Sequence, residues 1–334
     1  MISKETWCSK LASHLSPLKL RYPFIQGGMG NISPPELCAA VSRAGGLGQI
    51  GAGSLPVGEV EAKVKKVLDL LGDRYEYGLN VPLSVHPDIQ GVMDLILAYK
   101  IPVVSLSAGN PQPWAERLKA EGIKVMVVVS TVRQAKKAEE AGADVIVAEG
   151  FEAAGKNSPK ELTTMTLIPQ VARAVSCPVV AAGGIGDGRG FLAALALGAR
   201  GVQMGTRLIA TMEAHVHEHY QQALLESGDE DTLVVGRRYG RVTRLLKTPY
   251  AERIAQAERN GMEEHEFLRK LDEESHYRGA ILGQLDQGHV NAGQISGAID
   301  RIVTVQELFE SMVDEAYQAL GALSLGEFSG EERR

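Results

Sequence analysis

The sequence has few cysteines, no cysteine pair at metal-site spacing and no long apolar run. Its thiols, Cys8, Cys38 and Cys177, are too widely separated for a disulfide framework or a zinc-ligand pattern. No segment approaches the roughly 18 consecutive apolar residues of a membrane-spanning helix, and the first residues contain no signal-peptide core. We therefore expect a cytoplasmic protein with reduced thiols and no membrane partner.

An excess of positive charge is also missing. The formal net charge is -6, which gives no reason to expect nucleic acid as a partner. Of the 334 residues, 44% are hydrophobic and 23% are charged, which is the balance of an ordinary globular protein with enough material for a core. This length allows one large domain or two smaller ones.

From residue 23 to about residue 228, short apolar runs alternate with segments whose apolar residues have helical spacing. The expected strands cover residues 24–27, 46–50, 77–81, 103–108, 124–129, 144–150, 178–184 and 201–206. The runs are almost continuously apolar, which is typical of parallel strands buried on both faces. About eight strand–helix units in about 205 residues favour an α/β fold of the TIM (β/α)8 barrel type.

A doubly wound open sheet is the main rival of the barrel. It would place a G-x-G-x-x-G sequence after its first strand, and QGGMGNIS at 26–33 lacks that spacing. The glycine-rich GGIGDGRG at 183–190 instead follows the seventh strand. The first helix of the alternation has a clear start, because Ser33 can cap it, Pro34 suits its first turn and Glu36 completes a capping box.

The pattern changes after residue 228. Residues 229–300 are rich in charge and in helical spacing, and we expect a smaller helical insertion that covers the barrel mouth. The barrel would then comprise residues 1–228 and 301–320, with a closing helix in the second part. Residues 321–334 are expected to form a frayed tail.

The ends of the seventh and eighth strands carry glycine-rich turns. The active site of a TIM barrel lies at the C-terminal ends of its strands, and a phosphate site often follows these two strands. Gly183 and Gly184 leave their amides open to a phosphate, and Gly205 and Thr206 add amides and a hydroxyl. The alternative is that these glycines only serve tight turns, but two such loops in consecutive places favour phosphate binding.

Other strand ends suit a flat aromatic ligand. Gly27 and Gly28 follow the first strand, where the backbone must approach a ring closely. Asn80 ends the third strand, Lys124 begins the fifth, and Glu149 ends the sixth. At the barrel mouth, Asn80 and Lys124 would contact the polar edge of an isoalloxazine ring, where a lysine stabilises the charge of a reduced flavin. The alternative for Lys124 is a solvated lysine between a helix and a strand.

Several motifs together resemble one flavoprotein family. They are QGGMG at 26–30, AAVSRAGGLGQIGAG at 39–53, LNV at 79–81, SAGNP at 107–111, EGFEAAGKNSPKELTTMTLIPQV at 149–171, AAGGIGDGRG at 181–190 and GVQMGTR at 201–207. The family groups nitronate monooxygenases (formerly 2-nitropropane dioxygenases) with flavin-dependent enoyl-acyl-carrier-protein reductases, and the resemblance covers about residues 20–320. The segments 161–171, 236–247 and 291–299 are more similar to the enoyl reductases.

The resemblance implies a TIM barrel that binds FMN without a covalent bond. The implied FMN contacts are Gly27, Gly28, Met29, Asn80, Lys124, Glu149, Gly183, Gly184, Met204, Gly205, Thr206 and Gln294. The resemblance further implies reduction of the C=C bond of an enoyl thioester, with NADH or NADPH as co-substrate and acyl carrier protein as a candidate partner. The alternatives are oxidation of alkyl nitronates with O2 and a non-catalytic FMN-binding paralogue.

One departure from the family pattern concerns the catalytic loop. The family has Glu-Ala-Gly-Gly-His there, whereas this sequence has EAAGK at 152–156, so Lys156 stands at the histidine position and Ala154 replaces a glycine. A lysine near its usual pKa of about 10.4 is a cationic donor and no base. Removal of a proton from a neutral nitroalkane is therefore disfavoured, whereas polarising a thioester carbonyl or binding a nitronate anion is compatible with Lys156. The alternative is an exposed loop lysine without a catalytic role.

Two further clusters are less informative. His215, His217 and His219 alternate along a segment expected to be helical, which brings only two of them to one face, so we expect no metal site. A basic cluster comprises Arg237, Arg238, Arg241, Arg244 and Lys247. It would bind the phosphates of a nicotinamide cofactor or a pantetheine carrier, or an acidic helix of a carrier protein, or else form a solvated face. A homodimer is the default oligomeric state.

Overall fold

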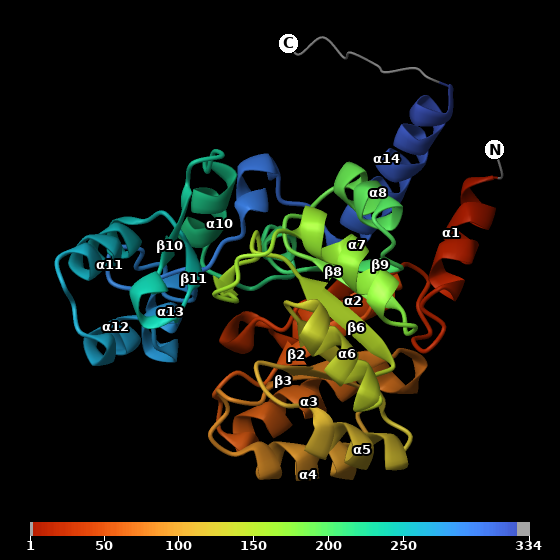
Figure 1. Cartoon of the computed structure of the whole chain (residues 1–334), viewed down its shortest axis with the longest axis horizontal. Coiled ribbons are helices and arrows are strands. Elements are labelled where there is room, and N and C mark those ends of the chain that lie inside the picture. The colour runs from red at the N-terminus through yellow and green to blue at the C-terminus, as the bar shows by residue number, and fades with distance from the viewer. Residues whose placement is uncertain (1–2, 326–334) are drawn as a thin grey trace.

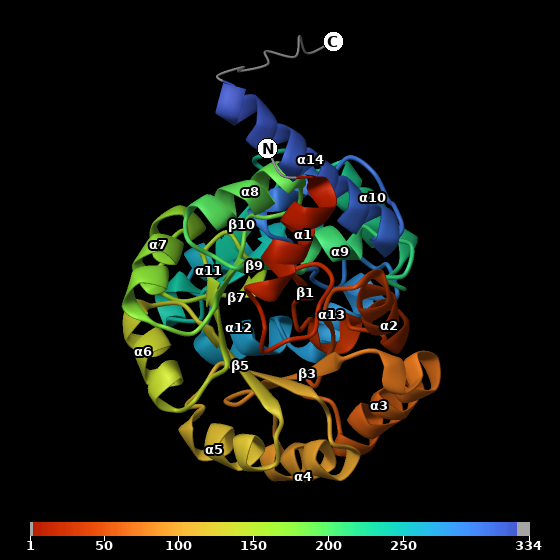
Figure 2. The same cartoon turned by 90° about the vertical axis from the view of Figure 1, so that its right-hand side faces the viewer.

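The computed structural model of the chain describes residues 3–325, and its centre is a closed barrel of parallel strands (Figures 1 and 2). The strands are β1 (Phe24–Gln26), β2 (Gly48–Gly51), β3 (Tyr77–Pro82), β4 (Val103–Ser107), β5 (Lys124–Val129), β6 (Val145–Glu149), β8 (Val179–Ala182) and β9 (Gly201–Met204). Their order in the sheet is β1-β9-β8-β6-β5-β4-β3-β2, and a parallel bridge between Ile25 and Leu47 closes the ring. The predicted TIM barrel and its eight strands are confirmed.

A ring of helices surrounds the strands (Figure 2). The helices after the first seven barrel strands are α2 (Pro35–Ala44), α3 (Val57–Leu71), α4 (Ile89–Tyr99), α5 (Gln112–Ala120), α6 (Val132–Glu140), α7 (Thr164–Ala174) and α8 (Gly188–Ala196). After β9 comes only the short α9 (Thr206–Ile209), and α14 (Val305–Leu325) packs between α8 and α2 as the closing helix of the ring. Within residues 3–325, no helix combines the length and apolarity needed to cross a bilayer.

The inside of the barrel is a small apolar core that is closed at the N-terminal ends of the strands. Ile25, Met126 and Val180 are among the inward-facing side chains, and all three are fully buried. Leu15 and Leu18, which follow α1 (Lys4–Ser13), pack against this core from below. Because this end is filled, the open end of the barrel is the C-terminal one, where TIM barrels carry their active sites.

The start of α2 differs from the sequence-based expectation. Pro34 is the N-cap residue and its side chain makes no capping bond, so the predicted capping box with Ser33 and Glu36 is wrong. The Ser33 hydroxyl instead accepts a hydrogen bond from the amide of Met29 at 2.9 Å. Ser33 therefore stabilises the loop after β1, where a ligand-binding backbone was expected, and Pro34 occupies the N-cap position of α2.

The segment predicted as a helical insertion begins with a β-hairpin. Strands β10 (Thr232–Val235) and β11 (Thr243–Leu246) pair antiparallel, and three helices follow: α11 (Pro249–Arg259), α12 (Glu264–Lys270) and α13 (Glu273–Ala280). The preceding helix α10 (Glu218–Leu225) also packs on this side, because Tyr220 and Leu224 are buried against residues of β11 and α13. Short 3-10 turns lie at Gly30–Ile32, Gly72–Arg74, Arg237–Tyr239 and Gln294–Ala298.

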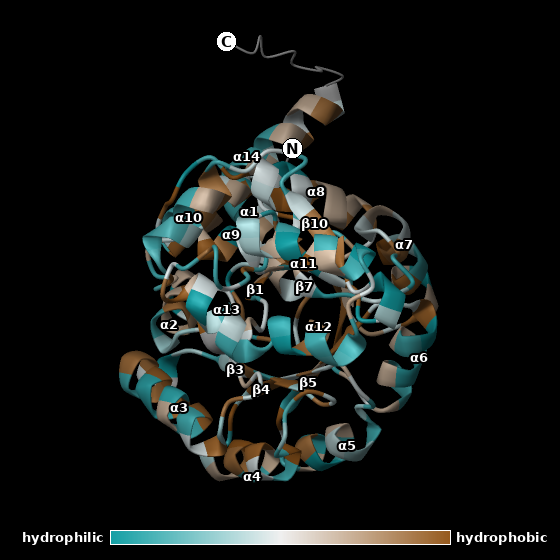
Figure 3. Ribbon diagram, turned by 90° about the vertical axis from the view of Figure 1, so that its left-hand side faces the viewer, coloured by the Kyte–Doolittle hydropathy of each residue, from teal (hydrophilic) through white to brown (hydrophobic). Residues whose placement is uncertain are grey.

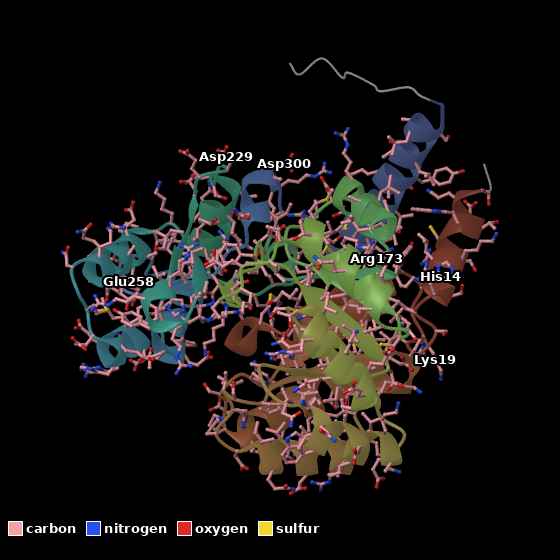
Figure 4. All side chains as sticks on the ribbon, in the orientation of Figure 1. His14, Lys19, Arg173, Asp229, Glu258 and Asp300 are labelled. Atoms are coloured by element: carbon pink, nitrogen blue, oxygen red, sulfur yellow. The ribbon has the colours of Figure 1, made fainter. Side chains whose placement is uncertain are left out.

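The insertion projects from one side of the barrel (Figure 1). Seen from that side, α12 and α13 lie in front of the barrel strands with mostly hydrophilic outer surfaces (Figure 3). In Figure 4, Glu258 of α11 marks the far end of the insertion, whereas His14 and Lys19 lie at the opposite end of the molecule. The insertion therefore approaches the barrel from the C-terminal ends of its strands, where it can wall a site.

Candidate active site

A cavity of about 1050 Å³ lies between the C-terminal ends of the barrel strands and the insertion. Its lining includes the loop after β1 (residues 27–30), the loop after β6 (residues 152–159), the turns after β8 and β9, and residues of the insertion. A volume of this order accommodates a cofactor together with part of a substrate. The cavity brings together most of the residues that the sequence analysis selected.

One end of the cavity presents main-chain N–H groups without acceptors. Among the described residues, the amides of Gly183, Gly184 and Gly205 donate to no other group. Gly183 and Gly184 have φ angles of +96° and +72°, a left-handed conformation that other residues rarely adopt. The Thr206 hydroxyl accepts from the amide of Gly293 at 2.9 Å, so its own proton remains available to a ligand. This arrangement suits a phosphate group.

Another wall of the cavity joins the loop after β1 to the end of β3. A Cβ atom at Gly28 would lie 2.4 Å from the side chain of Asn80, so only glycine lets the backbone lie against this amide. Asn80 is itself held by Ser105, whose hydroxyl and carbonyl accept from its Nδ2 at 3.2 and 3.3 Å. Gly28 and Asn80 therefore form one flat, rigid surface.

The remaining residues expected near this wall also line the cavity. Gly27 is fixed by a hydrogen bond from its amide to the carbonyl of Met204. The sulfur of Met29 lies 3.6 Å from where a Cβ atom at Gly205 would be, which connects the turns after β1 and β9. The two methionines thus add apolar surface beside the exposed amides.

The floor of the cavity is polar. Glu149 follows Val145 and Val147 at alternate positions of β6, and those two valines face the barrel interior, so the Glu149 carboxyl lies above them. It makes no hydrogen bond or ion pair with a described residue, and burial raises its pKa to about 7. Gln203 of β9 also lines the cavity, and its buried Oε1 accepts no hydrogen bond from a described residue. Such unpaired polar atoms are expected where a polar ligand completes the hydrogen bonding.

The loop after β6 carries Lys156 and is paired with the insertion. The amide of Phe151 donates to the carbonyl of Leu162, which closes the loop at its base. Residues Gly155–Lys156 form the short strand β7, which pairs antiparallel with β11, with Lys156 opposite Thr243. The Lys156 side chain is exposed at the cavity rim and forms no ion pair with a described acid.

Further contacts hold this loop in place. Arg244 of β11 lies over the Phe151 ring, 4.7 Å from the guanidinium carbon to the ring centroid, and donates to the Phe151 carbonyl at 3.1 and 3.2 Å. The Glu152 carboxylate accepts from the amide and hydroxyl of Thr164 at the start of α7. Glu152 therefore fixes the loop to the barrel, while Arg244 fixes it to the insertion.

Two buried histidines of the insertion line the same cavity. His276 of α13 and His289 are 6% and 4% exposed, and their rings stack with centroids 5.1 Å apart. Burial lowers the pKa of His276 to about 4 and that of His289 well below its ordinary value. Sequence analysis missed both residues. The only signal in the sequence is that glycines lie close to both histidines, in SHYRG at 275–279 and QGHVNAG at 287–293. These glycines do not reveal which side of the insertion faces the barrel.

Comparison with known proteins assigns the family. The family described as nitronate monooxygenase matches residues 13–315. The chain belongs to the nitronate monooxygenase family. A probable nitronate monooxygenase of Staphylococcus haemolyticus is 32% identical, over 89% of this chain and 95% of that protein. The predicted resemblance is confirmed, and membership indicates an oxidoreductase.

Solved structures extend this similarity. FabK from Thermotoga maritima has 36% identity and a TM-score of 0.88, covering 95% of this chain and 98% of that chain. A nitroalkane oxidase from Streptomyces ansochromogenes has 27% identity and a TM-score of 0.81, covering 93% of this chain and 99% of the other. Both branches of the family therefore have folds similar to this chain along nearly its whole length.

Two residues expected at the family's cofactor site lie elsewhere. Lys124 is the first residue of β5, paired with Val103 at the start of β4, and is exposed at the end of the barrel opposite the cavity. The expectation that it lies at the barrel mouth is wrong, because parallel strands place all their first residues at the closed end. The Gln294 side chain is exposed and does not line the cavity, although its amide donates to the Glu152 carbonyl.

The basic cluster of the insertion is largely paired within the protein. Arg237 pairs with Glu161 at 2.6 Å, Arg241 with Glu264 at 3.3 Å, and Lys247 with Asp231 at 3.8 Å. Arg244 is committed to Phe151 and to the Thr232 hydroxyl. These contacts favour a structural role for the cluster over phosphate binding.

The three alternating histidines do not occupy one helix. Helix α10 begins at Glu218, so His215 precedes it, and the ring of His217 caps its start by accepting from the amide of His219. The rings of His217 and His219 contact each other at an interplanar angle of 58°, with centroids 4.5 Å apart. Within the described residues, no three side chains gather in a way that could hold a metal ion.

Replacing Glu149 by glutamine is expected to alter how stability depends on pH. The pKa of Glu149 in the folded state, about 7, exceeds its ordinary value of 4.5, so the folded protein binds the proton more tightly than the unfolded chain does. This proton binding stabilises the folded state fully below pH 4.5, and the stabilisation is lost as the pH rises through 7. Relative to Glu149→Gln, the wild type should lose up to about 3 kcal/mol of unfolding free energy between about pH 5 and pH 8. Urea titrations of the cofactor-free protein measure this, and Glu230→Gln, at an exposed carboxyl, is the control. The same pH trend in both variants would contradict the assignment.

Proposed function

We propose that the cavity binds FMN without a covalent bond. The unpaired amides of Gly183, Gly184 and Gly205 would bind the phosphate together with the Thr206 hydroxyl. The flat surface of Gly28 and Asn80 would lie against the ring, since a side chain at position 28 has no room. Bound there, FMN would supply two-electron redox chemistry.

The proposed reaction is the NAD(P)H-dependent reduction of the C=C bond of an enoyl thioester. The observation that carries it is Lys156, a cation at the cavity rim that forms no ion pair with any acid in the described part of the chain. Charge develops on the thioester oxygen during such a reduction, and a cation placed beside that oxygen stabilises it. The similarity to FabK, an enoyl-acyl-carrier-protein reductase, supports this choice.

Oxidation of alkyl nitronates is the second candidate. A nitronate is already an anion, so Lys156 could bind it without any base having to remove a proton. Relatives described as probable nitronate monooxygenases support this candidate. The two reactions differ in the source of electrons, which is NAD(P)H in the first and the nitronate itself in the second.

Anaerobic flavin spectroscopy separates the two reactions. The protein loaded with FMN should be bleached by NADH or NADPH and should regain its colour on addition of crotonyl-CoA. If ethyl nitronate bleaches the flavin and crotonyl-CoA does not restore the colour, the second candidate replaces the first. A protein that binds FMN but responds to neither substrate would be a non-catalytic paralogue, and a protein that binds no FMN would overturn the proposal.

Gly184→Ala is expected to weaken FMN binding at least about 10-fold. The added methyl group would lie 3.2 Å from Cβ of Glu152 and would crowd the amides proposed to bind the phosphate. Gly122→Ala is a matched control, because Gly122 has nearly the same φ, +75° against +72°, and lies in open space. The dissociation constant, from flavin fluorescence quenching, measures the effect. An equal loss in both variants would show that backbone strain alone is responsible.

Lys156→Met is expected to lower kcat/KM for the accepted substrate by about 100-fold, the usual loss when one donor to a developing oxyanion is removed. The FMN dissociation constant should stay within about 3-fold, because Lys156 lies away from the glycine-rich turns. Lys160→Met, at an exposed lysine of the same loop, is the control and should match the wild type. Unchanged rates in Lys156→Met would show that Lys156 has no catalytic role.

A further inference from the structure

The insertion places a histidine with a defined hydrogen-bonding state against the cavity. The amide of His289 donates to the hydroxyl of Ser275 at 3.4 Å, so the Ser275 oxygen acts as an acceptor there. The hydroxyl's other contact is Nδ1 of His289 at 3.0 Å, and this nitrogen is the acceptor available to the hydroxyl proton. Assigned in this way, the neutral ring carries its proton on Nε2.

The protonated nitrogen of His289 is free to meet a ligand. Nε2 of His289 makes no hydrogen bond with a described residue. It is also absent from the unpaired side-chain atoms that are fully buried, so it retains some accessible surface. His289 is 4% exposed and lines the cavity, so the small accessible surface of Nε2 is cavity surface. A neutral N–H donor is therefore presented to the space where the substrate would lie.

Burial and charge keep this ring neutral. Its pKa is lowered by burial, by the neighbouring His276 and by the positive charge of the Lys156 ammonium. The carboxyl of Glu273 also lines the cavity, and its pKa is raised by burial and by Asp272 and lowered by Lys156 and Lys63. A neutral donor beside a cation adds a hydrogen bond without repelling that cation, as a second charged group would.

We propose that Nε2–H of His289 and Nζ of Lys156 form a donor pair for a delocalised oxyanion of the substrate. Both residues line the cavity, His289 from the insertion and Lys156 from the loop after β6, which β7 joins to β11 of the insertion. The pair fits either the enolate oxygen of a thioester or an oxygen of a nitronate. Which of the two is the natural substrate rests on the proposed function. A neutral imidazole used as an oxyanion donor is established in enzyme chemistry.

The pair defines the electron movement in the reductive reaction. FMN held in the cavity would supply hydride to Cβ of the enoyl thioester, and the C=C electron pair would then move towards the carbonyl oxygen. The two donors stabilise that oxygen, and the charge is neutralised when a proton from water adds to Cα. In this scheme neither His289 nor Lys156 transfers a proton, which agrees with an imidazole that stays neutral.

Two substitutions of His289 separate an oxyanion donor from a structural contact. Glutamine places an N–H donor where Nε2 lies but cannot reach Ser275, whereas asparagine keeps the Ser275 contact and lacks the distal donor. His289→Asn should lose about 100-fold in kcat with KM nearly unchanged, and His289→Gln should stay within about 10-fold of the wild type. Equal activity, equal loss or the reverse order would overturn the inference. His265→Asn, at an exposed histidine, is the control for the substitution itself.

A binding measurement keeps the test independent of turnover. Acetoacetyl-CoA has no C=C bond to reduce and binds an oxyanion donor as its enolate, which has its own ultraviolet absorption. The wild-type holoenzyme should bind it with a raised enolate fraction, and both His289→Asn and Lys156→Met should bind it at least 10-fold more weakly. Thermal unfolding and FMN content establish that each variant is folded. If the wild type turns over neither substrate class but this pattern holds, the proposed function fails and the donor pair stands; if the wild type is active and affinity is unchanged in His289→Asn, the pair fails alone.

Discussion

The pairing of β7 with β11 is the interaction on which the rest of the site depends. The loop that carries Lys156 leaves the barrel at the end of β6, at Glu149, and the hairpin of the insertion begins about eighty residues later, at Thr232, so this pairing joins two segments that are far apart in the sequence. The amide of Asn157 extends the pairing by donating to the Val242 carbonyl at 2.8 Å. Main-chain hydrogen bonds thus make one wall from two distant parts of the chain.

Burial keeps several titratable groups of the cavity in their neutral forms. Glu149 at the floor and the two histidines of the insertion all have pKa values shifted towards the neutral form, because water has been removed from around them. Lys156 at the rim is the contrasting group, a cation that faces open space. A substrate that acquires negative charge beside Lys156 meets a cation and several neutral dipoles, which is the environment expected to favour an oxyanion.

The fold was predictable from the sequence because its signals are local. Buried parallel strands read as short apolar runs, and glycines mark the turns after β8 and β9, so the barrel and its glycine-rich end followed directly. Lys124 was misplaced because a residue at the start of a strand was treated as if it lay at the mouth. His276 and His289 were missed because their position depends on packing of the insertion against the barrel, which no spacing encodes. The β10–β11 hairpin was not predicted, because Arg237 and Arg241 lie between its strands and the segment was interpreted as a basic surface.

The mode of attachment of the loop that carries Lys156 has an evolutionary consequence. Strand pairing at position 156 uses only the peptide groups of Lys156 and Thr243, so it is indifferent to which side chain the position carries. Lineages could therefore exchange histidine for lysine at this point without rebuilding the surrounding scaffold. A shared architecture with an interchangeable side chain at a single position would let one ancestral barrel give rise to enzymes with different substrates.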